Sequence, residues 1–175
     1  MTVINAIREK AVEILPRQAL RLFAAPYVAG DSMEAALQKA RELANMGVAA
    51  TIDVLGEDAH SQADIDHYID IYDRLAEALA TDSRLAKLAP SLRPSISMKP
   101  SCFVVAAKTD GGMIRDPASV DWDGCARTMA ELVGRIVARD IRVTIDMENH
   151  QWTDLTLNLY RELFSRYGRL VGTVL

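Results

Sequence analysis

Residues 142–150, RVTIDMENH, run from a β-branched, apolar segment directly into two acids, Asp146 and Glu148. Residues 50–58, ATIDVLGED, repeat this pattern earlier in the chain, with Asp53 at the corresponding place. A buried strand that ends in carboxylates brings charge to one edge of a sheet, and α/β proteins place their chemistry at that edge. The two stretches therefore predict strands whose carboxyl ends meet in a functional site.

Four segments have the composition of strands, and segments with helical periodicity separate them. The expected strands lie near residues 49–55, 94–99, 142–147 and 171–175. The expected helices lie at residues 4–22 (broken at Pro16), 33–46, 61–89, 122–139 and 154–167. This alternation predicts a parallel sheet with right-handed crossovers, its strands adjacent in chain order and its helices on one outer face. Residues 102–121 are expected to form an elaborated strand-to-helix connection.

Neither a dinucleotide fingerprint nor a phosphate-binding loop follows any expected strand, which leaves a TIM-type (β/α)8 barrel as the predicted α/β fold. A complete barrel needs about 250 residues and eight strands. The 175-residue chain is therefore expected to hold about the first four strands, a partial barrel. We expect N-terminal helices in a lead-in at residues 1–26, then barrel strands 1–4 with their helices at residues 27–175. The first strand is apolar enough to be covered on both faces.

The composition narrows the classes of function. The net charge is -4 with a pI of about 5.4, and no long run of Lys or Arg is present, so nucleic acid is not an expected partner. Cys102 and Cys125 have neither zinc-site nor disulfide spacing and are expected to be reduced thiols. No signal peptide or stretch of about 18 apolar residues is present, which predicts a cytoplasmic protein and leaves a peripheral membrane contact open.

One lysine stands among the acids at the predicted strand ends. Asp146 lies within or at the edge of its strand, where an unpaired carboxylate would be costly to desolvate. Lys99 ends the neighbouring strand and is the expected cationic partner. We therefore predict that Lys99 and Asp146 come within ion-pair range at the carboxyl edge of the sheet.

These stretches carry a resemblance to a known family. Residues 27–58, YVAGDSMEAALQKARELANMGVAATIDVLGED, together with SISMK, VTIDMEN and LYRELFSRYGRLVGTVL, resemble the N-terminal half of the flavin-dependent proline dehydrogenases. The family includes single-function bacterial enzymes and the dehydrogenase domain of bifunctional proline-utilisation proteins. The resemblance covers residues 27–175, and its most specific parts are the Asp-x-Leu-Gly-Glu block and the Ile-Asp-Met-Glu strand end.

The resemblance implies an activity and a set of roles. The activity is FAD-dependent oxidation of L-proline to 1-pyrroline-5-carboxylate, with electrons passed to a quinone, in the cytoplasm or at the periphery of the inner membrane. Lys99 resembles the lysine that holds the proline carboxylate, and Asp146 the active-site aspartate beside the flavin. Met147 matches the position whose backbone lies along the isoalloxazine, and Val174 a second approach to it. Gly56 and Glu57 are expected to be structural parts of the rim, and no residue is assigned to a metal.

The sequence departs from the family in two places. PSCFVVAAK follows Lys99, where the family has a small polar residue and a Leu-Gly pattern, so this wall of the pocket is expected to differ. The family's flavin-binding glutamine and arginine, and its two substrate-binding arginines, correspond to positions beyond Leu175. The chain is therefore expected to be an incomplete portion, weakly active or inactive alone, with an open sheet edge that favours self-association.

Two other classes of function stay open at this point. Acids at strand ends also suit a metal-dependent sugar isomerase or aldolase barrel, with Asp53, Asp146, Glu148 and His150 as ligands. Lys99 in the same rim speaks against that reading, as does Met147, because alternate residues of a strand share a face. The other class is a non-catalytic half-barrel that pairs with a second copy.

Overall fold

The computed structural model describes residues 28–56, 58–109 and 112–174. By its internal contacts the chain divides into two units, residues 1–39 and 40–175. The predicted lead-in at residues 1–26 lies outside the described residues, as does Glu57. Helix α3 spans Met33–Asn45, begins after Ser32, whose hydroxyl accepts a hydrogen bond from the Ala35 amide (3.3 Å), and ends before Gly47 (φ 74°), as the sequence predicts.

The described residues form one parallel sheet in the order β1-β2-β3-β4. The strands are β1 (Thr51–Asp53), β2 (Ser95–Met98), β3 (Val143–Ile145) and β4 (Val171–Thr173). One row of register partners runs across all of them through Ile52, Ile96, Val143 and Val171. The predicted parallel order is therefore confirmed, although each strand is shorter than its expected range.

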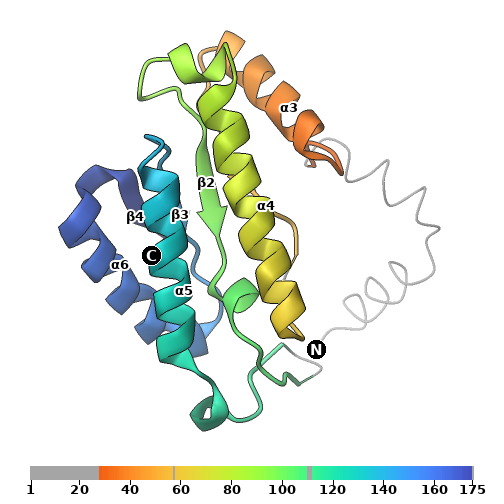
Figure 1. Cartoon of the computed structure of the whole chain (residues 1–175), viewed down its shortest axis with the longest axis vertical. Helices are drawn as coiled ribbons and strands as arrows, with labels where there is room; N and C mark the ends of the chain where they lie inside the picture. The colour runs from red at the N-terminus through yellow and green to blue at the C-terminus, as the bar shows by residue number, and fades with distance from the viewer. Residues whose placement is uncertain (1–27, 57, 110–111, 175) are drawn as a thin grey trace, which may run out of the picture. The chain divides into compact units, whose positions relative to one another are not determined.

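Three helices pack side by side along this sheet. They are α4 (Gln62–Thr81), α5 (Trp122–Val137) and α6 (Thr153–Tyr167), and α5 lies between the other two (Figure 1). The predicted inner face of α5 is buried throughout: Cys125, Met129, Leu132, Val133, Ile136 and Val137. Among the described residues, no helix has both the length and the apolar composition needed to cross a bilayer.

The two faces of the sheet differ in chemistry. Ile96, Met98, Val143 and Ile145 point to one face, and all are fully buried. The other face carries Thr51, Asp53, Ser95, Ser97 and Thr144, by the alternation of side chains along a strand. On this face, the side chains of Thr51 and Asp53 are exposed. The expectation that the first strand is covered on both faces is wrong here, because its alternation of polar and apolar residues suits a half-buried strand.

The helix expected over residues 61–89 ends early, at Thr81. The Asp82 carboxylate accepts hydrogen bonds from the amides of Arg84 (2.9 Å) and Leu85 (2.8 Å), and from the Arg41 guanidinium (2.7 Å). Such side-chain acceptors compete with helical hydrogen bonds and start a new turn. The chain therefore leaves α4 at Asp82 and forms the short 3-10 helix η1 (Leu85–Lys87).

Asp82→Ala is expected to lower the free energy of unfolding by about 2 kcal/mol, because two amides and Arg41 lose a charged acceptor. Burial alone raises the pKa of Asp82, but these hydrogen bonds outweigh it and lower the pKa below the usual 3.8. The stabilisation is therefore present above pH 3.8 and is lost as the pH falls through the lower native pKa. Urea unfolding from neutral to acidic pH measures both effects. Asp70→Ala, which breaks an exposed pair with Arg74, is the control and should cost no more than about 0.5 kcal/mol.

The connection between β2 and α5 is elaborated, as predicted. It contains two short 3-10 helices, η2 (Pro100–Phe103) and η3 (Pro117–Ser119), and an antiparallel bridge between Lys108 and Ile114. The Gln151 side chain bonds both backbone groups of Ile114, accepting from its amide (2.7 Å) and donating to its carbonyl (3.1 Å). The loop after β3 thereby holds the loop after β2.

Candidate functional site

The carboxyl ends of the strands place three of the predicted site residues in one row. Met98, Ile145 and Thr173 are register partners on β2, β3 and β4. The next residue on each strand is Lys99, Asp146 and Val174, on the polar face of the sheet. Parallel strands thus bring these residues from distant parts of the sequence to one edge.

Lys99 forms the centre of this edge. Its ammonium lies 2.5 Å from Asp53 Oδ2 and 3.9 Å from Asp146 Oδ2, and its side chain is only 13% exposed. The predicted approach of Lys99 to Asp146 is confirmed, but the shorter contact, with Asp53, was missed. The signal was present in the sequence, because Asp53 also ends a strand beside β2.

The two carboxylates determine the charge of the lysine. Partial burial alone would lower the pKa of Lys99, but the hydrogen bond to Asp53 and the negative charges of Asp53 and Asp146 raise it above 10.5. Lys99 is therefore a permanent cation at physiological pH. A cation held at the edge of a sheet by two acids can bind a further anionic group.

Asp53→Asn is expected to lower the pKa of Lys99, because it removes the closest negative charge and leaves the burial unchanged. The measurement is a pH titration of the lysine methyl signals by NMR after reductive ¹³C-methylation, with the Lys99 signal assigned from Lys99→Arg. Asp66→Asn, on an exposed position of α4, is the control. An unchanged Lys99 titration in Asp53→Asn would contradict the assigned pair.

Asp146 is held by its own backbone neighbours. Its amide donates to the Met98 carbonyl (2.8 Å), and its Oδ1 atom accepts from the Met147 amide (3.0 Å). These contacts leave Oδ2 directed to Lys99. Met147 is partly buried, whereas Val174 exposes 49% of its surface.

Near this edge lies a buried aromatic residue for which the sequence analysis gave no role. Tyr72 is fully buried against Phe103, with 5.7 Å between ring centroids. Burial, followed by the charges of Cys102 and Asp53, raises the pKa of Tyr72, so its hydroxyl stays neutral. Gly56 packs closely against Tyr68, because a Cβ at position 56 would lie 2.5 Å from the Tyr68 hydroxyl.

The acids of the alternative metal site do not converge in the described residues. Lys99 stands between Asp53 and Asp146, and Glu148 Oε2 accepts a hydrogen bond from the Ser101 amide (2.9 Å). His150 is exposed. No group of three His, Cys, Asp or Glu side chains in the described part of the chain could hold a metal ion.

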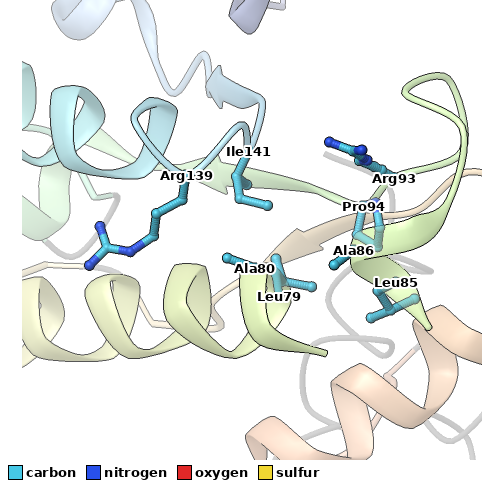
Figure 2. A pocket seen from close by; sticks show the side chains of 8 residues that line it. All are labelled: Leu79, Ala80, Leu85, Ala86, Arg93, Pro94, Arg139 and Ile141. Atoms are coloured by element: carbon cyan, nitrogen blue, oxygen red, sulfur yellow. The ribbon is translucent and has the colours of Figure 1, made fainter. Parts of the chain in front are cut away.

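A shallow pocket lies at the opposite edge of the sheet (Figure 2). Two residues that line it, Pro94 and Ile141, lie one residue before β2 and two residues before β3. Its volume of about 110 Å³ is well below the 300–1,000 Å³ of ordinary ligand sites. The arginines at its two sides, Arg93 and Arg139, are already paired with acids. We therefore do not assign a ligand to this pocket.

The geometry defines a class of protein: an α/β protein with a parallel sheet of TIM-barrel type and a lysine–carboxylate cluster at the carboxyl edge. The sequence model of the proline dehydrogenase family matches residues 36–174. The chain belongs to the proline dehydrogenase family.

Relatives agree with this membership. The chain is 31% identical to proline dehydrogenase of Deinococcus radiodurans, with 99% of this chain and 50% of the relative aligned. It is 28% identical to proline dehydrogenase 1 of Bacillus subtilis strain 168, over 89% of this chain and 44% of the relative. The chain thus spans about half the length of the curated relatives it matches.

Solved structures agree with the fold. Proline utilization A (PutA) from Bdellovibrio bacteriovorus, inactivated by N-propargylglycine, superposes with a TM-score of 0.73 at 20% identity, over 91% of this chain and 17% of that one. A PutA variant from Bradyrhizobium japonicum gives a TM-score of 0.60 at 25% identity, over 90% and 16% of the two chains. The predicted α/β fold is therefore confirmed.

Proposed function

We propose that this protein takes part in the FAD-dependent oxidation of L-proline to 1-pyrroline-5-carboxylate, with a quinone as electron acceptor. The observation that carries the proposal is the Lys99 ammonium held between Asp53 and Asp146 at the carboxyl edge of the sheet. Relatives named proline dehydrogenase, aligned with nearly all of this chain, support the choice of substrate.

In this proposal Lys99 binds the proline carboxylate. Asp53 and Asp146 keep the ammonium charged and oriented, so the cation is in place before proline arrives. Removal of a hydride from the ring requires the proline nitrogen to be neutral, and the surplus of carboxylates over lysine at this edge offers proton acceptors. Asp146, the assigned catalytic residue, lies beside both the lysine and the expected flavin position.

The residues present suit a flavin. Val174 is 49% exposed and follows the register partner of Ile145, as Asp146 follows Ile145 itself, so its apolar side chain is available for contact with a planar ring at this edge. The Met147 backbone lies directly after Asp146 at the same edge, so Asp146, Met147 and Val174 would hold the ring. When bound, FAD supplies the electron sink for the oxidation.

The partners and the location belong to the same proposal. A quinone with a hydrocarbon tail partitions into membranes, so we place the protein in the cytoplasm, peripheral to the inner membrane. We also propose that the edge of β4, which has no further strand beside it among the described residues, pairs with another copy. Sedimentation equilibrium would detect such self-association.

The experiment that tests the function uses the full chain purified with FAD. After desalting, the retained flavin is measured by its absorbance, and L-proline is then added without oxygen. We expect loss of the oxidised-flavin absorbance with L-proline and none with pyrrolidine, which keeps the ring amine but lacks the carboxylate. Protein that retains stoichiometric FAD and shows no response to L-proline would contradict the proposed function.

A further inference from the structure

The chain bends sharply after β2, and consecutive peptide groups of this bend are held from outside it. The bend comprises residues 98–101 and carries Lys99. Each of its four carbonyls accepts a hydrogen bond. The Met98 carbonyl accepts from the Asp146 amide (2.8 Å), and the Lys99 carbonyl accepts from the Cys102 amide (3.1 Å). The Pro100 carbonyl accepts from Cys125 Sγ (3.5 Å), and the Ser101 carbonyl accepts from the Ala59 amide (3.1 Å). The backbone beneath Lys99 is therefore constrained at every carbonyl.

Glu148 supplies a further contact, to the Ser101 amide within the bend. Its Oε2 atom accepts from the Ser101 amide at 2.9 Å, and Ser101 is 1% exposed. A buried amide without an acceptor is costly, and a carboxylate is the strongest acceptor that a side chain offers. Lys99, at the start of η2, provides no side-chain cap of its own. The acceptor thus comes from the loop after β3, 47 residues away in the sequence.

A second observation places the Glu148 charge beside this bend. Burial, followed by the negative charge of Glu148, raises the pKa of Cys125 to about 12. The Cys125 thiol is the group that donates to the Pro100 carbonyl. Glu148 and Cys125 therefore hold the N–H and the C=O of a single peptide group, the one that joins Pro100 to Ser101.

We propose that Glu148 is a positioning residue for Lys99, acting through the Ser101 amide to hold the lysine where it meets Asp53 and Asp146. Lys99 precedes Ser101 by two residues, so a shift of the bend displaces the lysine from its acids. The role of Lys99 in holding proline rests on the proposed function, whereas the positioning itself does not.

The first experiment follows Lys99 without substrate or flavin, by NMR titration of the ¹³C-methylated lysines in the full chain. Glu148→Ala should shift the Lys99 titration toward that of an exposed lysine. Glu148→Gln removes the charge but keeps an oxygen acceptor for Ser101, so it should titrate close to wild type. The control, Glu131→Ala, removes an exposed carboxylate from α5 and should have no effect.

Two results of this titration would overturn the inference. If Glu148→Gln shifts Lys99 as much as Glu148→Ala, Glu148 acts by its charge through space and not by positioning. If neither variant shifts Lys99, Glu148 does not control the lysine at all. Circular dichroism identifies an unfolded Glu148→Ala variant, and in that event Glu148→Asp, whose shorter side chain no longer reaches Ser101, takes its place in the same comparison.

The second experiment uses proline oxidation by the FAD-loaded chain. Glu148→Ala should reduce kcat/KM for L-proline by on the order of tenfold, mainly through KM, since a misplacement of about 1 Å costs up to 10²-fold. In a Lys99→Ala background it should cost nothing further. A full additional loss there would contradict positioning through Lys99. If the wild-type chain retains stoichiometric FAD and does not oxidise proline, the proposed function fails, and the titration still decides the positioning.

Discussion

Lys99→Ala is expected to raise the KM for L-proline by about 10²–10³-fold, which corresponds to about 3–4 kcal/mol. The substitution removes the cation that would bind the proline carboxylate. It also leaves Asp53 and Asp146 facing that carboxylate without compensation, and like charges repel. The measurement is steady-state proline oxidation by the FAD-loaded protein.

Two comparisons make this prediction specific. Flavin retention after desalting should change much less than KM, because Lys99 is assigned to the substrate and not to the cofactor. Lys87→Ala, at an exposed position of η1, is the matched control and should leave both quantities unchanged. An unchanged KM in Lys99→Ala would remove Lys99 from the substrate site.

Trp152→Ala is expected to lower the free energy of unfolding by about 3–5 kcal/mol. Trp152 is fully buried, packs edge-on against Trp122 with 5.2 Å between ring centroids, and has the Lys108 ammonium 5.5 Å from its ring. The cavity left by the indole would loosen the loop after β3 from the loop after β2. Urea unfolding at neutral pH measures the change, with Trp152→Phe as the control that keeps an aromatic ring and should lose much less. A loss below about 1 kcal/mol for Trp152→Ala would show that the core closes around the missing ring.

The order and direction of the strands could be predicted because apolar strands and amphipathic helices alternate along the chain. Strand ends in a parallel sheet share one edge, so the meeting of Lys99 with Asp146 also followed from the sequence. The exact extent of the elements did not follow, since it depends on local competition for backbone groups. Asp82 is an example: its hydrogen bonds to Arg84 and Leu85 end α4 before the helical pattern ends.

The partner choice within the site was harder to predict. Three acids lie at the ends of the two strands that flank β2, Asp53 on β1 and Asp146 and Glu148 after β3, and the sequence does not give the distances that decide which one reaches Lys99. Asp53 is the nearer of the two acids around the lysine, while Glu148 turns to a backbone amide instead. The family resemblance gave roles for Lys99, Asp146, Met147 and Val174, and those roles stay predictions for the experiments above.

The contact between Lys99 and Asp53 joins residues that are 46 positions apart in the sequence, with the whole of α4 between them. Contacts over such separations form late in folding, because the chain must close a long loop before they add any stability. The charged cluster can therefore assemble only when β1 and β2 have paired in register, and a chain with helices but no sheet would lack it. During refolding, the time at which Lys99 reaches its final electrostatic environment would therefore report the time at which β1 and β2 pair.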